Sequence, residues 1–182
     1  TKEALLRSKE WYVNNKIDLK LNTNIKFINH KNKSLSDEKD NLYHYDKLVI
    51  ATGSKNNLLG IDTEEYQKGT FFSLRNLEDS KRIRKKISEI QTITIIGAGF
   101  IGLEIATTAL QLNKDVTIIE NSENVMGRSI SKDLSKWLIN HYTKSGIKFI
   151  FNKSFKSFKS DKISMINVVL SNDSKINSEM VL

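Results

Sequence analysis

The chain has 182 residues, enough for one or two domains with a sizeable core, and its 38% hydrophobic content and mean hydropathy of -0.40 are typical of a soluble globular protein. No apolar run reaches the length of a membrane span, the lack of cysteine excludes disulfides and thiolate metal sites within these residues, and the three histidines show no metal-ligand spacing. The net charge of +8 raises the question of nucleic acid, but the lysines are spread along the chain without interleaved aromatic residues. We therefore expect a soluble, cytoplasmic protein without a membrane, metal or nucleic-acid partner. The chain contains no proline, and we attribute both this and part of the positive charge to a general compositional bias of the sequence.

The N-terminal third of the sequence predicts short elements followed by one buried strand. Residues 1–14 carry apolar side chains near helical spacing and predict a helix. Two short strands, a polar hairpin or loop and a returning strand are then expected at Ile17–Leu21, Ile25–Ile28, residues 29–41 and Leu42–Asp46. The apolar segment Lys47–Ser54 predicts a buried strand that reaches a glycine at Gly53, and residues 55–62 read as an exposed connection.

A glycine-rich turn between two apolar strands is the most informative feature of the chain. After a short strand at Thr70–Ser73 and a helix at Asn76–Ile90, the β-branched run Ile93–Ile96 suits a buried parallel strand. Residues 97–102, with the sequence Gly-Ala-Gly-Phe-Ile-Gly, then form a G-x-G-x-x-G turn that opens a helix. This order predicts a dinucleotide pyrophosphate held at the helix N terminus, because backbone N–H groups and the helix dipole attract phosphate there.

Each residue of this motif has an expected role. Gly97 lets the chain reverse tightly, Gly99 lets the backbone approach phosphate, and Gly102 lets the helix lie close to the strand. The next strand, Val116–Ile119, leads to Glu120, where a carboxylate is expected to accept hydrogen bonds from an adenosine ribose. The alternative is a glycine-rich turn in an α/β protein that binds no nucleotide, and the register of strand, helix, strand and acid argues against it.

Glu120 also bears on which nucleotide is bound. A carboxylate favours the free 2′-hydroxyl of NAD and repels the 2′-phosphate of NADP, so we expect NADH to be preferred over NADPH. Asn121, Ser122 and Glu123 supply no cation that would reverse this preference. Arg128 is the one nearby cation that argues the other way.

The C-terminal part of the chain completes the α/β unit and adds strands. Lys132–Ser145 predicts an amphipathic helix that Gly146 ends, and Ile147–Phe151 the following strand. Three apolar pieces then predict a three-stranded antiparallel meander, at Phe155–Phe158, Ile163–Leu170 and Ile176–Leu182. The separating turns include Ser160-Asp161, and the lysines around Phe155 and Phe158 favour an edge strand over a platform for stacking nucleic-acid bases.

Two motifs in a fixed relation carry a family resemblance. YDKLVIATGS (Tyr45–Ser54) precedes IIGAGFIGLEIA (Ile95–Ala106), with LRNLEDSKRI (Leu74–Ile83) between them. The chain thus resembles the FAD-dependent pyridine nucleotide-disulfide oxidoreductase superfamily, in which an FAD domain is interrupted by an NAD(P)H domain. The resemblance implies an α/β fold with a partial FAD-binding domain at 1–74 and a nearly complete Rossmann-like NAD(P)H-binding domain at 75–182, whose parallel sheet carries the antiparallel meander.

The start of the chain and Met126-Gly127-Arg128 are similar to the ferredoxin and rubredoxin reductase branch. The resemblance implies hydride transfer from NADH to FAD, with electrons passing to a small iron–sulfur or similar carrier. NADH oxidases, nitrite reductases and coenzyme A disulfide reductases of the same superfamily remain alternatives. A nucleotide-binding module without turnover is the alternative of a different class.

Site residues follow from the resemblance position by position. Ala51, Thr52 and Gly53 match a segment that passes close to FAD, and the glycine turn matches the NADH pyrophosphate site. Glu104 matches an acid that lies near the nicotinamide, although it could also be an ordinary first-turn acid stabilised by the helix dipole.

The family's first glycine motif, which holds the FAD pyrophosphate, is expected before residue 1, and further motifs after residue 182. We therefore expect an internal fragment that is inactive alone and does not hold FAD tightly, and whose lack of cysteine says nothing about disulfide chemistry.

Overall fold

The structure is a computed structural model, and it describes residues 6–62, 64, 68–127, 129–160 and 165–182. By its internal contacts the chain divides into two compact units, Thr1–Gly53 and Ser54–Leu182. Residues 54–74 thus lie in the second unit. The predicted boundary between an FAD-binding domain at 1–74 and an NAD(P)H-binding domain at 75–182 stays a prediction. Among the described residues, no helix is both long and apolar enough to cross a membrane.

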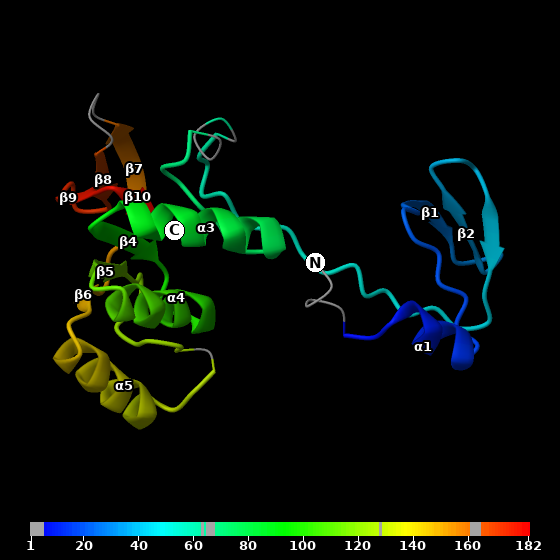
Figure 1. The fold of residues 1–182 in the computed structure, drawn as a ribbon, viewed down its shortest axis with the longest axis horizontal. Coiled ribbons are helices and arrows are strands. Elements are labelled where there is room, and N and C mark those ends of the chain that lie inside the picture. The colour runs from blue at the N-terminus through cyan, green and yellow to red at the C-terminus, as the bar shows by residue number, and fades with distance from the viewer. Residues whose placement is uncertain (1–5, 63, 65–67, 128, 161–164) are drawn as a thin grey trace. The chain divides into compact units, whose positions relative to one another are not determined.

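The first unit contains a short helix and a small antiparallel sheet (Figure 1). Helix α1 (Lys9–Asn14) begins after Ser8, whose Oγ accepts a hydrogen bond from the Trp11 N–H at 3.3 Å. The sheet has the order β1-β2-β3, with bounds Ile25–Asn29, Ser34–Asp37 and Leu42–His44. The predicted hairpin or loop at 29–41 therefore contains a strand of its own, β2. Of the predicted helix 1–14, residues 6–8 are not helical and residues 1–5 lie outside the described part.

Asp37 holds the turn between β2 and β3 together. Its carboxylate accepts hydrogen bonds from the Lys39 and Asn41 N–H groups at 2.9 Å, from Asn41 Nδ2 at 2.9 Å and from the Tyr43 hydroxyl at 2.8 Å. The hydrogen bond from the Asn41 side chain is the largest cause that lowers the pKa of Asp37, from its ordinary 3.8 to about 2. The buried carboxylate is therefore fully satisfied, which identifies it as a structural group.

Two predicted strands of the first unit are wrong. Ile17–Leu21 has no strand, and neither does Lys47–Ser54, where Val49 is 85% and Ile50 65% exposed. A strand needs a neighbour to take up its backbone N–H and C=O groups. Neither segment has such a neighbour among the described residues, so apolar composition alone does not make it a strand.

The second unit is built on a parallel sheet with the order β10-β4-β5-β6. Its strands are Met180–Val181, Thr92–Ile96, Asp115–Ile119 and Lys148–Ile150. The helices between and before them are α3 (Leu77–Glu89), α4 (Phe100–Gln111) and α5 (Lys132–Lys144). Asn76 begins α3 with a reciprocal capping box to Asp79, which confirms the predicted start of that helix.

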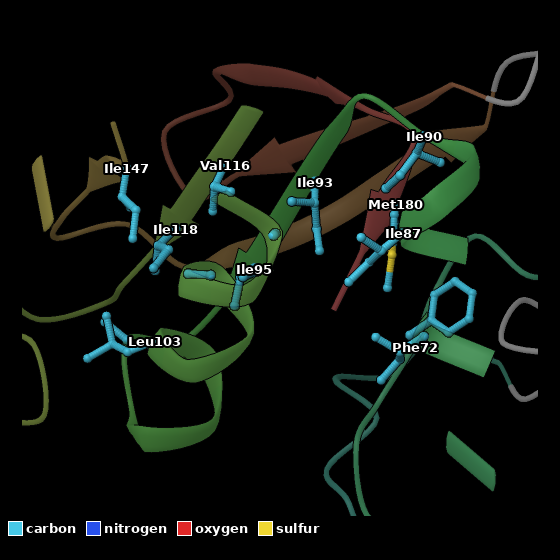
Figure 2. Close-up of a cluster of buried hydrophobic side chains, with 14 of the residues drawn as sticks. Phe72, Ile87, Ile90, Ile93, Ile95, Leu103, Val116, Ile118, Ile147 and Met180 are labelled. Carbon is cyan, nitrogen blue, oxygen red and sulfur yellow. The ribbon is translucent and has the colours of Figure 1, made fainter. Parts of the chain in front are cut away.

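The two faces of this sheet have different covers. On one face, Ile93, Ile95 and Ile118 pack with Leu103 of α4 and Ile87 of α3 in one cluster of buried side chains (Figure 2). On the other face, side chains such as Ile119 and Val181 pack against an antiparallel sheet of order β7-β8-β9. The bounds of these strands are Phe155–Ser160, Ile166–Leu170 and Lys175–Ser178. The predicted α/β fold with a three-stranded meander is therefore present, with a central strand buried on both faces.

Several predicted boundaries change in the second unit. The predicted strand Ile176–Leu182 is two strands, of which β9 closes the meander and β10 joins the parallel sheet beside β4. Thr70–Ser73 contributes only an isolated parallel bridge between Phe71 and Val181. The connection at 55–62 is not wholly exposed, because Ile61 is buried. Of the predicted turn at Ser160-Asp161 and strand Ile163–Leu170, residues 161–164 lie outside the described part.

Glu179 fastens the last strand to the sheet. Its carboxylate accepts hydrogen bonds from the Gln91 and Thr92 N–H groups at 2.8 Å and from the Thr92 hydroxyl at 3.1 Å. Burial raises the pKa of Glu179, but these three hydrogen bonds together outweigh it and the net pKa is lowered. The carboxylate thus ties β10 to the start of β4, the strand that leads into the glycine turn.

Candidate dinucleotide site

The turn between β4 and α4 has the backbone geometry that the glycine motif predicts. Gly97 has φ of +104°, and its N–H donates to the Ile119 carbonyl at 2.8 Å, so the turn is anchored to the neighbouring strand β5. A Cβ on Gly102 would overlap the Gly97 carbonyl oxygen and lie 3.3 Å from Ile95 Cγ2. Helix α4 can therefore lie this close to β4 only with glycine at position 102.

Gly99 differs from the other two glycines because it has neither the positive φ of Gly97 nor the close packing of Gly102. A Cβ at this position would have no described atom within 4 Å. Packing within the protein therefore does not require glycine here, whereas close approach of a ligand to the backbone would. This agrees with the role predicted for Gly99, and phosphate binding itself stays a prediction.

The N terminus of α4 offers backbone donors on this open side. Gly99 is the N-cap and has no side chain to cap the helix, and the Leu103 N–H is the first to bond in the helical pattern, to the Gly99 carbonyl at 3.0 Å. The preceding amides of the first turn lack helical partners, as at any helix start. Phe100 and Ile101 are exposed beside them. Such a helix start suits an anion.

Glu120 lies at the carboxyl end of β5 and contacts the glycine turn directly. One carboxylate oxygen, Oε2, accepts a hydrogen bond from the Ala98 N–H at 2.9 Å. The other, Oε1, accepts from the Ser122 N–H at 2.9 Å and from the Ser122 hydroxyl at 3.0 Å. The fold therefore brings the predicted ribose acid and the predicted phosphate turn together, as parallel strands with adjacent carboxyl ends require.

An open pocket of about 510 Å³ lies between these groups. Its described lining residues are Ala98, Gly99, Glu120, Asn121, Ser122, Asn124, Met126, Gly127 and Ser129. None of these carries a positive charge, and Arg128, which could offset Glu120, lies outside the described residues. A smaller cavity of about 220 Å³ is lined by Glu120 and by Lys153, Ser154 and Phe155, beyond the end of β6.

Sequence reasoning gave no site role to Ser122 or Met126. The Met126 N–H donates to the Ala98 carbonyl at 2.9 Å, so the segment after β5 is attached to the glycine turn. Ser122 orients Glu120 through two hydrogen bonds. The only signal for Ser122 in the sequence was a hydroxyl residue two positions after the acid, which is common in turns generally.

The remaining predicted site residues belong to α4 and to the first unit. Glu104 is exposed, and α4 has no acidic residue in its first turn, so the alternative of a first-turn acid is wrong. Its predicted place near the nicotinamide stays a prediction. Ala51, Thr52 and Gly53 are exposed and belong to the first unit, where their predicted contact with FAD stays a prediction.

Comparison with known proteins gives a consistent result. The family model described as pyridine nucleotide-disulphide oxidoreductase matches residues 3–182. The chain is 29% identical to a rubredoxin-NAD(+) reductase of Pseudomonas putida and 30% identical to one of Ectopseudomonas oleovorans, each over 177 residues. Each alignment covers 97% of this chain and 46% of the relative, so the chain spans less than half the length of these curated relatives.

Solved structures show the same fold. A ferredoxin reductase from Rhodopseudomonas palustris superimposes with a TM-score of 0.86 at 24% identity, covering 100% of this chain and 44% of that one. A putidaredoxin reductase, solved in covalent complex with putidaredoxin, gives a TM-score of 0.84 at 26% identity with the same coverage.

Proposed function

Because the chain belongs to the pyridine nucleotide-disulphide oxidoreductase family, we propose that its second unit binds NADH at the turn between β4 and α4. The contact between Glu120 and the Ala98 N–H carries the proposal. This contact holds the Glu120 carboxylate beside the N terminus of α4, which supports a role for the carboxylate toward an adenosine ribose and for the helix start toward the pyrophosphate. Gly97 and Gly102 shape the turn, Gly99 leaves it open, and none of the described side chains caps the helix there.

In the whole protein we propose electron transfer from NADH through FAD to a small iron–sulfur or similar carrier. When bound, the nicotinamide supplies a hydride that the flavin accepts, and the chain's own contribution is to bind and orient the nucleotide. The rubredoxin reductase relatives and the putidaredoxin reductase structure support this class of acceptor. An NADH oxidase or a disulfide reductase of the same family is the second candidate, supported by the fold it shares with a water-forming NADH oxidase from Lactobacillus brevis.

We propose that the described residues do not make a complete FAD site by themselves. No glycine precedes Gly53 in the sequence, so residues 1–52 contain no second glycine turn of the kind found at 97–102. We expect the isolated 182-residue chain to purify without stoichiometric flavin. A yellow preparation with one FAD per chain would contradict this expectation.

Equilibrium binding tests the nucleotide assignment. In the full-length protein we expect NADH to bind more tightly than NADPH, and Glu120→Ala to reduce that preference, because the carboxylate repels a 2′-phosphate. Anaerobic stopped-flow mixing with NADH, followed at the flavin absorbance, separates an enzyme from a non-catalytic module, which would not bleach the flavin. A wild type that prefers NADPH would contradict the role of Glu120.

A further inference from the structure

Helix α5 packs against the rest of the second unit on one side. Leu138, Ile139 and Tyr142 lie against the main cluster of buried side chains. Ser135 is buried on the same side of the helix, and its hydroxyl donates to the Val125 carbonyl at 2.9 Å. These contacts fix which side of the helix faces inward. The helix lies at the edge of the second unit (Figure 1), so its opposite side faces outward.

The outward side of α5 carries a stripe of exposed residues with a tryptophan in its middle. Four residues at the spacing i, i+4, i+7 and i+11 share this side of the helix and form what we call the outer stripe: Asp133, Trp137, Asn140 and Lys144. Trp137 is 59% exposed, although tryptophan is ordinarily among the more buried residue types. Its ring stacks on His141, with centroids 5.3 Å apart and planes 7° apart. The indole is thus held in one orientation, which lowers the entropy cost of binding a partner.

The outer stripe is complementary to itself in charge. Within the described part of the chain, neither Asp133 nor Lys144 forms an ion pair. When a second copy of α5 is placed antiparallel, Asp133 of each copy lies opposite Lys144 of the other. Trp137 then lies opposite Asn140, and one two-fold axis between positions 138 and 139 relates both pairs, as a symmetric dimer requires. The helix dipole also favours an acid in the first turn and a base in the last, but it does not account for an exposed tryptophan between them.

We propose that the outer stripe is an interface at which two copies of this protein pair through antiparallel α5 helices. The two Trp137 side chains pack across the two-fold axis, and the two Asp133–Lys144 pairs fix the orientation. One helix from each copy makes a small interface, and the net charge of +8 on each chain opposes association, so the dimer is reversible and forms at high protein concentration. The inference is independent of the proposed nucleotide binding, because none of the four stripe residues lines the candidate pocket.

Sedimentation velocity of the full-length protein over a range of concentrations tests this interface. The samples are the wild type, Trp137→Ala, Asp133→Lys, Lys144→Asp, and an equimolar mixture of the two charge reversals. Each reversal alone places like charges opposite each other at both ends of the paired helices, whereas the mixture restores opposite charges at both ends. The matched control is Lys85→Asp, which makes the same charge change at an exposed position of α3. Circular dichroism of each variant checks that it is folded.

We expect Trp137→Ala and each charge reversal to raise the dissociation constant of the dimer about tenfold. The mixture of Asp133→Lys and Lys144→Asp should associate nearly as tightly as the wild type, and Lys85→Asp should not weaken the dimer. A wild type that stays monomeric at every concentration overturns the proposal. So does a dimer that Trp137→Ala and both reversals leave unchanged, because its interface then lies elsewhere. Folded reversal variants that fail to associate when mixed exclude the antiparallel pairing.

Discussion

Two apolar segments with similar composition take different structures in this chain. Thr92–Ile96 is the central strand β4, paired in parallel with both β5 and β10, and its Ile95 is 0% exposed. Lys47–Ser54 contains an equally apolar run but no strand, and its Val49 and Ile50 face solvent. The difference shows that burial comes from neighbours on both edges and both faces of a segment, and that an apolar run only permits it.

The difference in packing between the two segments can be tested by shortening one isoleucine in each, and this test has the largest expected effect. Ile95→Ala should cost about 2–5 kcal/mol of unfolding free energy, because it leaves a cavity between the sheet and α4. Ile50→Ala should change the free energy by about 0.5 kcal/mol or less, because its side chain is exposed. Denaturant unfolding measures both. Equal effects would show that 47–54 is as well packed as β4.

Adding a methyl group to the glycine turn should have the next largest effect. Gly102→Ala forces a Cβ into the Gly97 carbonyl oxygen, so α4 must shift, at a cost of about 1–3 kcal/mol. Gly99→Ala is the matched control, because its Cβ would point into open space. We expect Gly99→Ala to keep the thermal stability and to weaken NADH binding, and a destabilisation as large as that of Gly102→Ala would argue against an open turn.

Removing the carboxylate that ties β10 to β4 should have a smaller effect. Glu179→Ala deletes three hydrogen bonds and leaves the Gln91 and Thr92 amides without this acceptor, which should cost about 1–2 kcal/mol. Glu89→Ala, an exposed position on α3, serves as the control and should change the free energy by about 0.5 kcal/mol or less. Thermal unfolding measures the difference. An equal change in both variants would mean that the hydrogen bonds of Glu179 do not stabilise the pairing of β10 with β4.

The smallest expected effect concerns pH and the first unit. Asp37 has a folded pKa of about 2, below its ordinary 3.8, so the unfolded chain binds more protons between these values and stability rises with pH there. Its contribution should be fully present above about pH 4 and lost as pH falls through about 2. Hydrogen exchange of the amides in residues 25–44 measures this. Asp37→Asn should remove most of this pH dependence of amide exchange. If the variant keeps the wild-type pH dependence, groups other than Asp37 cause it.

The glycine turn was predictable because its requirements are local. Positive φ at Gly97 and the missing Cβ at Gly102 follow from the spacing of a strand and the helix that follows it directly. The capping box at Asn76 is similarly contained in four consecutive residues. Such features appear in the sequence because the interacting groups are close along the chain.

Other features depended on partners that are distant in the sequence. Whether Ile176–Leu182 is one strand or two depends on β4 and β8, which take different parts of it as neighbours. The hydrogen bond between the Ala98 N–H and the Glu120 carboxylate joins residues that are 22 positions apart. The two acceptors near the Ser122 hydroxyl, Glu120 Oε1 and the Asn124 carbonyl, come together only when the turn after β5 is folded.

The sequence by itself therefore determined the family resemblance, the α/β class and the identity of the candidate nucleotide turn, since each is encoded in local spacing. Tertiary structure alone decided which apolar runs became strands and how the ends of β4 and β5 meet. It also decided which donors hold the Glu120 carboxylate. Burial and hydrogen-bond satisfaction depend on every neighbour of a group, and most of those neighbours are remote along the chain.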